Sequence, residues 1–406
     1  MDRRRVIAIA GAGVCAGMLP WHHAAAQGHT PLGYLRTNWS RDPHTFGSYS
    51  YVARGATQQD RRRLEAPVED RLFFAGEAAH PRYNSTVHAA YESGVRVADM
   101  VLSTPAAQIA VIGAGVSGLA TAQRLAAQGR TVTVFEARAR IGGRIHTNHD
   151  LGVPLDLGAS WIHGIRGNPI TALAQDLGVR TAQTSDSYVL RGANGIQMAD
   201  LDAPDWLDAV TEIQHSAGAD ADQINNTAYF AQRDYGGPDV VFPDGYSALF
   251  PALSGAYQTR LSAPIRAVRL RGSSVVLTLR SGDAPEFDAV IVTVSLGVLK
   301  QGQIAFDPAL PTEKTHAIAR LGMGTLDKIY LSFDRVFWDR DATWIITPET
   351  GLPPGYFNQW LNLYPVFNAP LLVGFNGGSP ALDLANAPDQ HIVDMATAVL
   401  RSAYPG

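Results

Sequence analysis

Cysteine is almost absent from this sequence of 406 residues, where Cys15 is the only one. It lies in an N-terminal segment that we expect to be removed. The mature chain would then have no disulfide, no thiolate metal site and no flavin attached through cysteine. The twelve histidines are scattered without the spacing of a metal site, so we expect no metal centre.

Long charged runs and long apolar runs are also missing. Only 17% of the residues are charged and the net charge is -4, without a basic run, which argues against a nucleic-acid partner. The apolar run at residues 6–20 is shorter than the ~18–20 residues that span a bilayer. With 46% hydrophobic residues the chain can bury a large core, and its length suggests two or three units of roughly 100–200 residues each.

The apolar run is part of a pattern typical of a secretory signal peptide. Three arginines at residues 3–5 precede it, and three alanines at residues 24–26 follow it. Paired arginines favour the twin-arginine route, which carries folded proteins. We expect residues 1–27 to be a cleaved signal, with a periplasmic or secreted product and no stable membrane association. An uncleaved membrane anchor is the alternative.

A glycine fingerprint predicts a dinucleotide site. Residues 109–112 have the pattern of a buried strand, and residues 117–128 that of the helix that follows. Gly113 permits the tight turn, Gly115 lets the backbone approach a pyrophosphate, and Gly118 lets helix and strand pack closely. The free N–H groups at the start of the helix would point at the phosphates.

The residues after the fingerprint complete the unit. Residues 131–135 are rich in β-branched side chains and predict the next strand. Glu136 follows about twenty residues after the turn, where a carboxylate holds ribose hydroxyls. A similar glycine pattern at residues 11–16 is followed by no such acid, and we assign it no cofactor role.

The segment Glu-Ala-Arg-Ala-Arg-Ile-Gly-Gly-Arg at residues 136–144 resembles the second signature of the flavin-dependent amine oxidase family. The resemblance is closest to polyamine oxidases and covers nearly all of residues 30–406. It implies one FAD, bound without a covalent link. It also implies that Arg138, Gly143 and Arg144 lie at the cofactor, where Arg144 supplies a fixed positive charge.

Other segments extend the resemblance around the cofactor. Residues 264–268 resemble the strand whose backbone contacts adenine, at Ile265. Gly76 and Glu77 match the family's acid that hydrogen-bonds the sugar or phosphate region. Residues 288–298 resemble the strand that returns to the cofactor domain, although Ser295 stands where the family usually has proline.

The last helix of the family begins like residues 85–88 of this chain. The resemblance implies that Thr86 and Val87 lie at a helix N-terminus that points at the flavin pyrimidine. A helix N-terminus there would stabilise the negative charge of the reduced flavin. His88, in the same turn, is expected to be structural.

Three residues are candidates for the chemistry. Lys328 lies in an apolar segment that matches the family's active-site lysine, which holds a water near flavin N5; a lysine that extends to solvent is the alternative. Tyr49 matches one wall of an aromatic cage that orients the amine. His163, in Trp-Ile-His-Gly, would bind the substrate nitrogen or relay a proton, and a packed structural histidine is the alternative. The sequence does not indicate the opposite wall.

The reaction that the resemblance implies is amine oxidation. A neutral amine, expected to be a polyamine, would lose a hydride equivalent to flavin N5, and the imine would hydrolyse to an aldehyde and an amine. Dioxygen would reoxidise the flavin and give hydrogen peroxide. An L-amino-acid oxidase is an alternative, for which Arg36 or Arg82 would have to bind the carboxylate. A flavin-binding protein with an impaired active site is a second one.

The expected fold class is α/β, with a Rossmann-like FAD-binding domain at residues 45–168 and 245–312. The α+β substrate domain would take residues 28–44, 169–244 and 313–406. The motifs stand in rotated order, because the end of the family's pattern comes before its beginning. A circular permutation explains this order, and a misassembled gene model is the alternative. The amine and the carbon attacked, and the oligomeric state, stay unknown.

Overall fold

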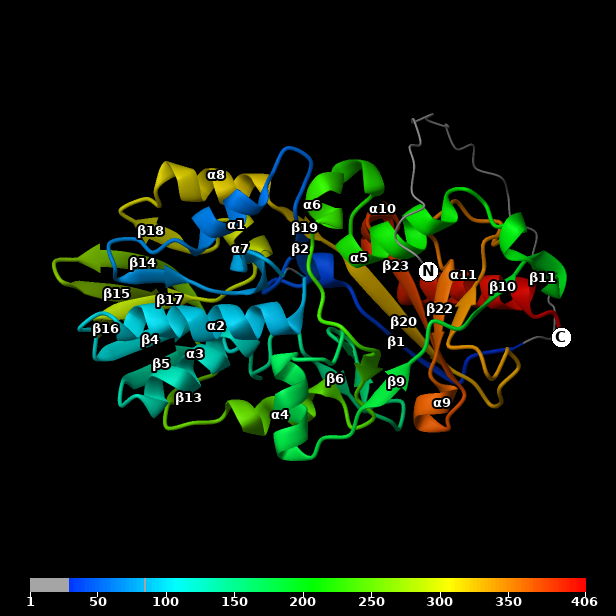
Figure 1. Ribbon diagram of the computed structural model, residues 1–406, viewed down its shortest axis with the longest axis horizontal. Coiled ribbons are helices and arrows are strands. Elements are labelled where there is room, and N and C mark those ends of the chain that lie inside the picture. Colours follow the sequence, from blue (N-terminus) through cyan, green and yellow to red (C-terminus); the bar gives the residue numbers. More distant parts are fainter. Residues whose placement is uncertain (1–28, 84) are drawn as a thin grey trace.

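The computed structural model describes residues 29–83 and 85–406. The predicted signal peptide lies outside the described residues. The described part forms two sheet systems that lie side by side along the longest axis of the molecule (Figure 1). One is built around a parallel sheet and the other around a mostly antiparallel one.

The first system has a five-stranded parallel sheet at its centre. Its strands, in spatial order, are β13 (Gln258–Arg260), β5 (Thr131–Phe135), β4 (Gln108–Ile112), β17 (Ala289–Val292) and β3 (Leu72–Phe74). Helices α2 (Val87–Leu102) and α3 (Val116–Ala127) pack on one face. The other face is covered by a four-stranded sheet of β16 (Glu286–Phe287), β15 (Ser274–Leu279), β14 (Ile265–Arg271) and β18 (Ala305–Asp307).

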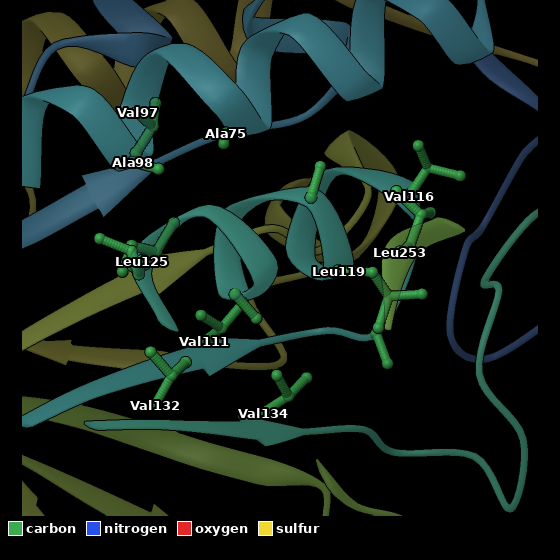
Figure 2. Packing of buried hydrophobic residues seen from close by; sticks show 14 of the residues in the cluster. Ala75, Val97, Ala98, Val111, Val116, Leu119, Leu125, Val132, Val134 and Leu253 are labelled. Carbon is green, nitrogen blue, oxygen red and sulfur yellow. The ribbon is translucent and has the colours of Figure 1, made fainter. Parts of the chain in front are cut away.

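Strand β4 shows how the sequence makes these layers. Successive side chains of a strand point to opposite faces. Ile109 and Val111 therefore pack on Leu119 of α3, whereas Ala110 and Ile112 join the core beneath β14 and β15. Figure 2 shows the helix side of this packing. Because both faces are buried, the strand is apolar throughout its centre, and each buried Ile or Val side chain contributes roughly 1.5–3 kcal/mol.

The second system is a seven-stranded sheet. Its strands, in spatial order, are β1 (Gly33–Arg36), β20 (Leu326–Ser332), β23 (Leu371–Gly377), β22 (Gln359–Asn362), β21 (Trp344–Ile346), β10 (Tyr188–Arg191) and β11 (Gln197–Met198). Helix α11 (Asp389–Ala403) covers one face through Ile392, Ala396 and Leu400.

Shorter elements connect the two systems. The small sheets are β2 (Tyr49–Tyr51) with β19 (Gly322–Gly324), β6 (Thr147–Asn148) with β7 (Leu155–Asp156), and β8 (Trp161–Ile162), β12 (Asp239–Val241) and β9 (Ala182–Thr184). The remaining α-helices are α1 (Gln58–Glu65), α4 (Pro169–Leu177), α5 (His215–Ala217), α6 (Asn226–Phe230), α7 (Leu296–Lys300), α8 (Thr312–Arg320), α9 (Tyr364–Phe367) and α10 (Ser379–Asp383). A π-helix at Ala209–Gln214 precedes α5. The domain boundaries expected from the sequence stay a prediction.

The expected strand–helix–strand unit is confirmed to within a residue at each boundary of β4, α3 and β5. One expectation is wrong: residues 288–298 are not a single strand, because β17 ends at Val292 and α7 starts at Leu296. The Ser295 hydroxyl caps α7 by accepting from the Val298 N–H at 3.2 Å, and it donates to the Thr45 carbonyl at 2.7 Å. Serine is a favoured N-cap, so this departure from the family pattern begins a helix.

Candidate functional site

A cavity of about 820 Å³ is lined by residues from both sheet systems. Almost all of the site residues predicted from the sequence lie in its wall. They are Tyr49, Gly76, Glu77, Thr86, Val87, Gly113, Gly115, Glu136, Arg138, Gly143, Arg144, His163, Ile265 and Lys328. Gly118 lies behind the wall, where a Cβ atom would come 2.0 Å from the Gly113 carbonyl oxygen, so its role is the close packing of helix on strand.

The glycine turn presents free backbone donors to the cavity. Gly113 has a φ of 109°, which favours glycine. Gly115 is the N-cap of α3, and no side chain caps this helix. Gly115, Val116 and Ser117 all line the cavity, so the N–H groups of the first turn are available to an anionic group.

Glu136 joins the glycine turn to the basic loop that follows β5. Its carboxylate accepts from the Ala114 N–H at 2.8 Å and from the Arg138 N–H at 2.8 Å. The side chain is buried yet belongs to the cavity wall. These two bonds fix the carboxylate at the position where the sequence predicts a ribose contact.

The basic loop is held in shape by an arginine that the sequence analysis did not single out. The Arg140 guanidinium donates to three carbonyls of its own loop, those of Ile141, Gly143 and Ile145, at 3.0–3.1 Å. Arg138 pairs with Asp42 at 2.6 Å. The loop therefore presents its cations from a fixed backbone.

Lys328 is buried, which rules out the alternative of a lysine extending to solvent. Its Nζ donates to the carbonyls of Asp156 and Gly158 at 2.8 and 2.7 Å, and to the Ser160 hydroxyl at 2.6 Å. Burial lowers the pKa of Lys328 to about 7, against the favourable charge of Asp156. Burial also raises the pKa of Asp156 to about 6. Burial therefore disfavours the charged form of this amine in the cavity wall.

Aromatic rings gather on the Lys328 side of the cavity. The Lys328 Nζ lies 5.7 Å from the centre of the Trp161 ring. Trp161 stacks on Trp344 at 6.0 Å, and Phe375 lies 6.1–6.2 Å from both rings. Tyr49 also lines the cavity. Trp344 and Phe375 come from strands of the seven-stranded sheet and are candidates for the wall that the sequence did not indicate.

Tyr49 and His215, which both line the cavity, are linked to each other. The Tyr49 hydroxyl donates to the His215 carbonyl, and burial raises the pKa of Tyr49 above its usual value. His215 follows directly on the π-helix, an irregularity frequent at functional sites. Its Nδ1 is 2.7 Å from Gln359 Oε1, and its Nε2 is buried without a hydrogen-bond partner among the described residues. Burial lowers the pKa of His215 to about 4.

His163 is not a packed structural histidine, because half of its side chain is exposed. Its Nδ1 lies 2.7 Å from Asp239 Oδ2, and the other oxygen of Asp239 accepts from the Gly164 N–H at 2.8 Å. Asp239 therefore orients the ring. His88, expected to be structural, packs edge-on against Tyr83 and Tyr235.

Sequence reasoning missed Arg140, Asp239, His215, Trp344 and Phe375. Arg140 lies in the motif at residues 136–144 but was given no role there, whereas the other four lie in no recognised motif and only the fold brings them to the cavity. The stretch at residues 184–225 contributes Asp186, Tyr188, Glu212 and His215 to the cavity wall.

Comparison with known proteins shows the family to which this chain belongs. The sequence pattern of the family described as "Flavin containing amine oxidoreductase" matches residues 15–102, 116–194 and 197–406. The chain belongs to this family. It is therefore a flavin amine oxidoreductase, and the family binds FAD.

Two plant proteins are among the similar relatives. Polyamine oxidase 4 of Oryza sativa subsp. japonica is 29% identical over 359 residues, covering 73% of this chain and 73% of the relative. Probable polyamine oxidase 4 of Arabidopsis thaliana is 30% identical over 358 residues, covering 73% and 71%. A solved structure, cyclohexylamine oxidase from Brevibacterium oxydans, has a TM-score of 0.56 at 21% identity and covers 74% of this chain and 82% of its own, which shows the shared fold.

The residues of the cavity fit FAD. The uncapped N-terminus of α3 offers backbone donors for a pyrophosphate, and Gly115 leaves the space above it open, since a Cβ atom there would meet nothing within 4 Å. Arg138 and Arg144 add positive charge to the same wall. Within the described residues no cluster of His, Cys, Asp or Glu could hold a metal ion. Over the same part of the chain, no helix is both long and apolar enough to cross a membrane.

Proposed function

We propose that this amine oxidoreductase acts on polyamines. Support comes from the cavity wall, which carries both aromatic rings and carboxylates. Besides Glu77 and Glu136, the carboxylates that line the cavity belong to Asp186, Glu212, Asp234 and Asp239. Aromatic faces and carboxylates attract ammonium groups, so a substrate with several amino groups is favoured.

The proposed roles divide between two ends of the cavity. The N-terminus of α3, with Arg138 and Arg144, would hold the pyrophosphate of FAD, and Glu136 would hold the ribose. When bound, FAD takes two electrons from the amine and passes them to O2, giving hydrogen peroxide. Tyr49 would orient the amine, and Lys328 would hold the water that attacks the imine.

His163 would accept or relay a proton at the substrate nitrogen. Asp239 fixes its ring through Nδ1, which leaves Nε2 to exchange the proton. The proposed overall reaction consumes one amine, one O2 and one water, and it yields an aldehyde, an amine and hydrogen peroxide.

A peroxide-release screen tests the substrate class. It would compare spermine, spermidine, N-acetylated polyamines, simple monoamines and L-amino acids on the purified enzyme. Spermine or spermidine should release peroxide, and L-amino acids should not. The reverse pattern would replace this proposal with an L-amino-acid oxidase.

The amino-acid oxidase alternative depends on an arginine that binds a carboxylate. Arg36 pairs with Asp389 at 2.7 Å, and neither Arg36 nor Arg82 lines the cavity. Arg233 does line it, so it is the residue that this alternative would use. A yellow protein that releases no peroxide with any of the amines or amino acids would instead support the alternative of a flavin-binding protein with an impaired active site.

We also propose that FAD is held without a covalent bond, because the sequence has no cysteine after Cys15. Acid precipitation should release all of the yellow colour into the supernatant. Colour that stays with the pellet would contradict this proposal.

Circular permutation of the chain is a further proposal. β3, from the early part of the chain, pairs with β17 in the parallel sheet, and five residues at 103–107 connect α2 to β4. His29 stacks on Phe337 at 3.5 Å, and Phe337 lies 6.0 Å from Tyr404. His29 and Tyr404, near the two ends of the described chain, therefore both contact Phe337. This proximity makes it feasible to rejoin the two ends.

Export through the twin-arginine route stays a proposal from the sequence. The pattern at residues 1–27 supports cleavage near Ala26 and a periplasmic or secreted product. N-terminal sequencing of the native protein tests it. A mature chain that still starts at Met1 would contradict it.

A further inference from the structure

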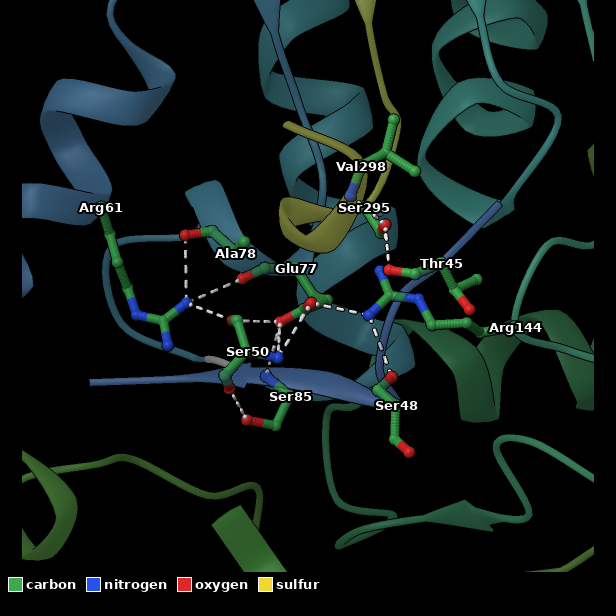
Figure 3. Close-up of polar contacts among 10 residues, drawn as sticks. All are labelled: Thr45, Ser48, Ser50, Arg61, Glu77, Ala78, Ser85, Arg144, Ser295 and Val298. Atoms are coloured by element: carbon green, nitrogen blue, oxygen red, sulfur yellow. Dashed lines mark hydrogen bonds and ion pairs between the residues drawn. The ribbon is translucent and has the colours of Figure 1, made fainter. Parts of the chain in front are cut away.

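A buried charge network lies behind the cofactor side of the cavity. It comprises Arg61, Ser50, Glu77 and Arg144, from α1, β2, the turn after β3 and the basic loop (Figure 3). Arg61 and Ser50 are 0% exposed and Glu77 is 4% exposed. We name these four residues the Arg61–Arg144 network.

The network is continuous from α1 to the cavity. Arg61 Nη1 donates to the Ser50 hydroxyl at 2.9 Å, and that hydroxyl donates to Glu77 Oε2 at 2.6 Å. Glu77 Oε1 accepts from Arg144 Nη1 at 2.8 Å. Arg144 Nη1 also donates to the Ser48 carbonyl at 3.1 Å.

Glu77 holds two parts of the cavity wall at once. Besides Arg144, its carboxylate accepts from the Ser85 N–H at 3.1 Å, just before the N-terminus of α2. Arg144, Glu77 and Ser85 all line the cavity, whereas Arg61 does not. Burial opposes ionisation of Glu77, but Arg144 and Arg61 outweigh it and hold the pKa of this carboxyl below its usual value.

A contribution to stability does not by itself explain why an arginine is buried at position 61. Its Nη1 also donates to the carbonyls of Ala78 and Glu77 at 3.0 and 3.3 Å. Its Nε and Nη2, however, are buried without a hydrogen-bond partner among the described residues. Unsatisfied buried donors destabilise a protein. Replacing a whole buried ion pair with apolar side chains of similar volume is often neutral or stabilising, so a buried charge network is weak evidence for a role in stability. Another role therefore explains this arginine better.

We propose that Arg61 is a positioning residue for the cofactor. Through Ser50 and Glu77 it would fix the Arg144 guanidinium against the pyrophosphate of FAD and the start of α2 against the flavin. The network contains two cations and one carboxylate, so it presents a net positive charge through Arg144. This inference rests on the binding of FAD in the cavity and not on the identity of the amine.

The test compares four variants of the full-length protein. Arg61→Met removes the charge and keeps the length of the side chain. Arg61→Lys keeps the positive charge but loses the planar guanidinium with its several donors. Ser50→Ala removes the hydroxyl that links Arg61 to Glu77. Arg62→Met is the matched control, because Arg62 lies on the exposed face of the same helix and its side chain donates to Gln59 of that helix. Three quantities are measured: the unfolding temperature of the apoprotein, the Kd of FAD, and the midpoint potential of the bound flavin.

Arg61→Met leaves the carbonyls of Glu77 and Ala78 without this donor and removes a cation from beside Glu77, so its apoprotein should unfold below the wild-type temperature. Its Kd for FAD should rise at least tenfold, and its midpoint potential should become more negative, because less positive charge is fixed at the flavin. Ser50→Ala should shift both quantities in the same direction. Arg61→Lys should restore part of the loss, and Arg62→Met should match the wild type.

Two results would overturn the inference. One is an Arg61→Met protein that folds and keeps the wild-type Kd and potential. The other, should Arg61→Met fail to fold, is a Ser50→Ala protein with both quantities unchanged. A failure of the peroxide screen with polyamines would leave this inference intact, because neither FAD affinity nor potential requires an amine.

Discussion

Lys328 combines burial, three hydrogen bonds and a lowered pKa, and these features suit a residue that acts in the cavity. Lys328→Met should keep FAD, because the side chain lies on the aromatic side of the cavity. Flavin reduction or reoxidation should slow at least about tenfold, an effect of ~1.4 kcal/mol. Stopped-flow measurement of both half-reactions checks this. Unchanged rates in both would leave Lys328 with a structural role only.

Tyr49 offers a test of the aromatic wall with its own control. Tyr49→Ala removes the ring and should weaken turnover of polyamines by roughly 1–2 kcal/mol, through lost stacking and cation–π contact. Tyr49→Phe keeps the ring and loses only the hydroxyl bond to His215. Steady-state kcat/KM of the two variants separates these effects. Equal losses would show that the hydroxyl, and not the ring, matters.

Glu77 predicts a pH dependence of stability. Its pKa in the folded protein lies below the ordinary value of 4.5, so the folded state binds fewer protons than the unfolded state in that range. Its contribution is therefore fully present above pH 4.5 and is lost as the pH falls through the folded pKa. Denaturant titrations of wild type and Glu77→Gln should show a difference in unfolding free energy that shrinks on acidification. A difference that grows towards low pH would contradict this sign.

At the scale of elements, two lysines donate hydrogen bonds to the last carbonyls of helices. Lys314 Nζ donates to the carbonyls of Arg63, Leu64 and Ala66 at the end of α1, at 2.6–3.0 Å. Lys300 Nζ donates to the carbonyls of Ile318, Ala319 and Leu321 at the end of α8, but Lys300 is exposed. Positive charge is stabilising at this end of a helix.

The two lysines therefore make a matched pair of substitutions. Lys314→Met should lower the unfolding free energy by about 1–3 kcal/mol, because it leaves buried carbonyls without a donor. Lys300→Met should cost less, because water can replace the ammonium. Urea unfolding of both variants measures the difference. A smaller loss for Lys314→Met than for Lys300→Met would contradict the account.

The sequence predicts elements well where local chemistry decides them. The β4–α3–β5 unit follows from glycines at fixed spacing, an apolar strand and a β-branched strand, and α2 begins at Val87 as expected. The strand expected at residues 288–298 ends already at Val292, and the Ser295 hydroxyl caps a helix that follows it. The π-helix before His215 has no sequence signal that we could use.

In the site too, the sequence predicts the residues that lie in local motifs but not those that only tertiary packing brings together. Residues in motifs, such as Gly115, Glu136 and Lys328, could be assigned to the cavity from the sequence. Trp344 and Phe375 could not, because they reach the wall from separate strands of the seven-stranded sheet and have no neighbouring motif. The partners of Glu77 were missed for a similar reason, since Arg61 and Ser50 meet it only through tertiary packing.

At the scale of the whole molecule, the proposed circular permutation has a direct test. Sequencing the gene locus through both junctions should reproduce the order in this chain if the permutation is genuine. A locus that reads in family order would show a misassembled gene. The contact of His29 and Tyr404 with Phe337 predicts that a chain rejoined in family order also folds and binds FAD.

The central claim is that one cavity binds FAD at one end and oxidises a polyamine at the other. Anaerobic mixing of the FAD-loaded protein with spermine or spermidine tests it most directly, because the flavin itself reports the electron transfer. The account predicts that the yellow absorbance bleaches and returns when air is admitted, with release of hydrogen peroxide. Flavin that stays oxidised with every polyamine, while an L-amino acid bleaches it, would contradict the account.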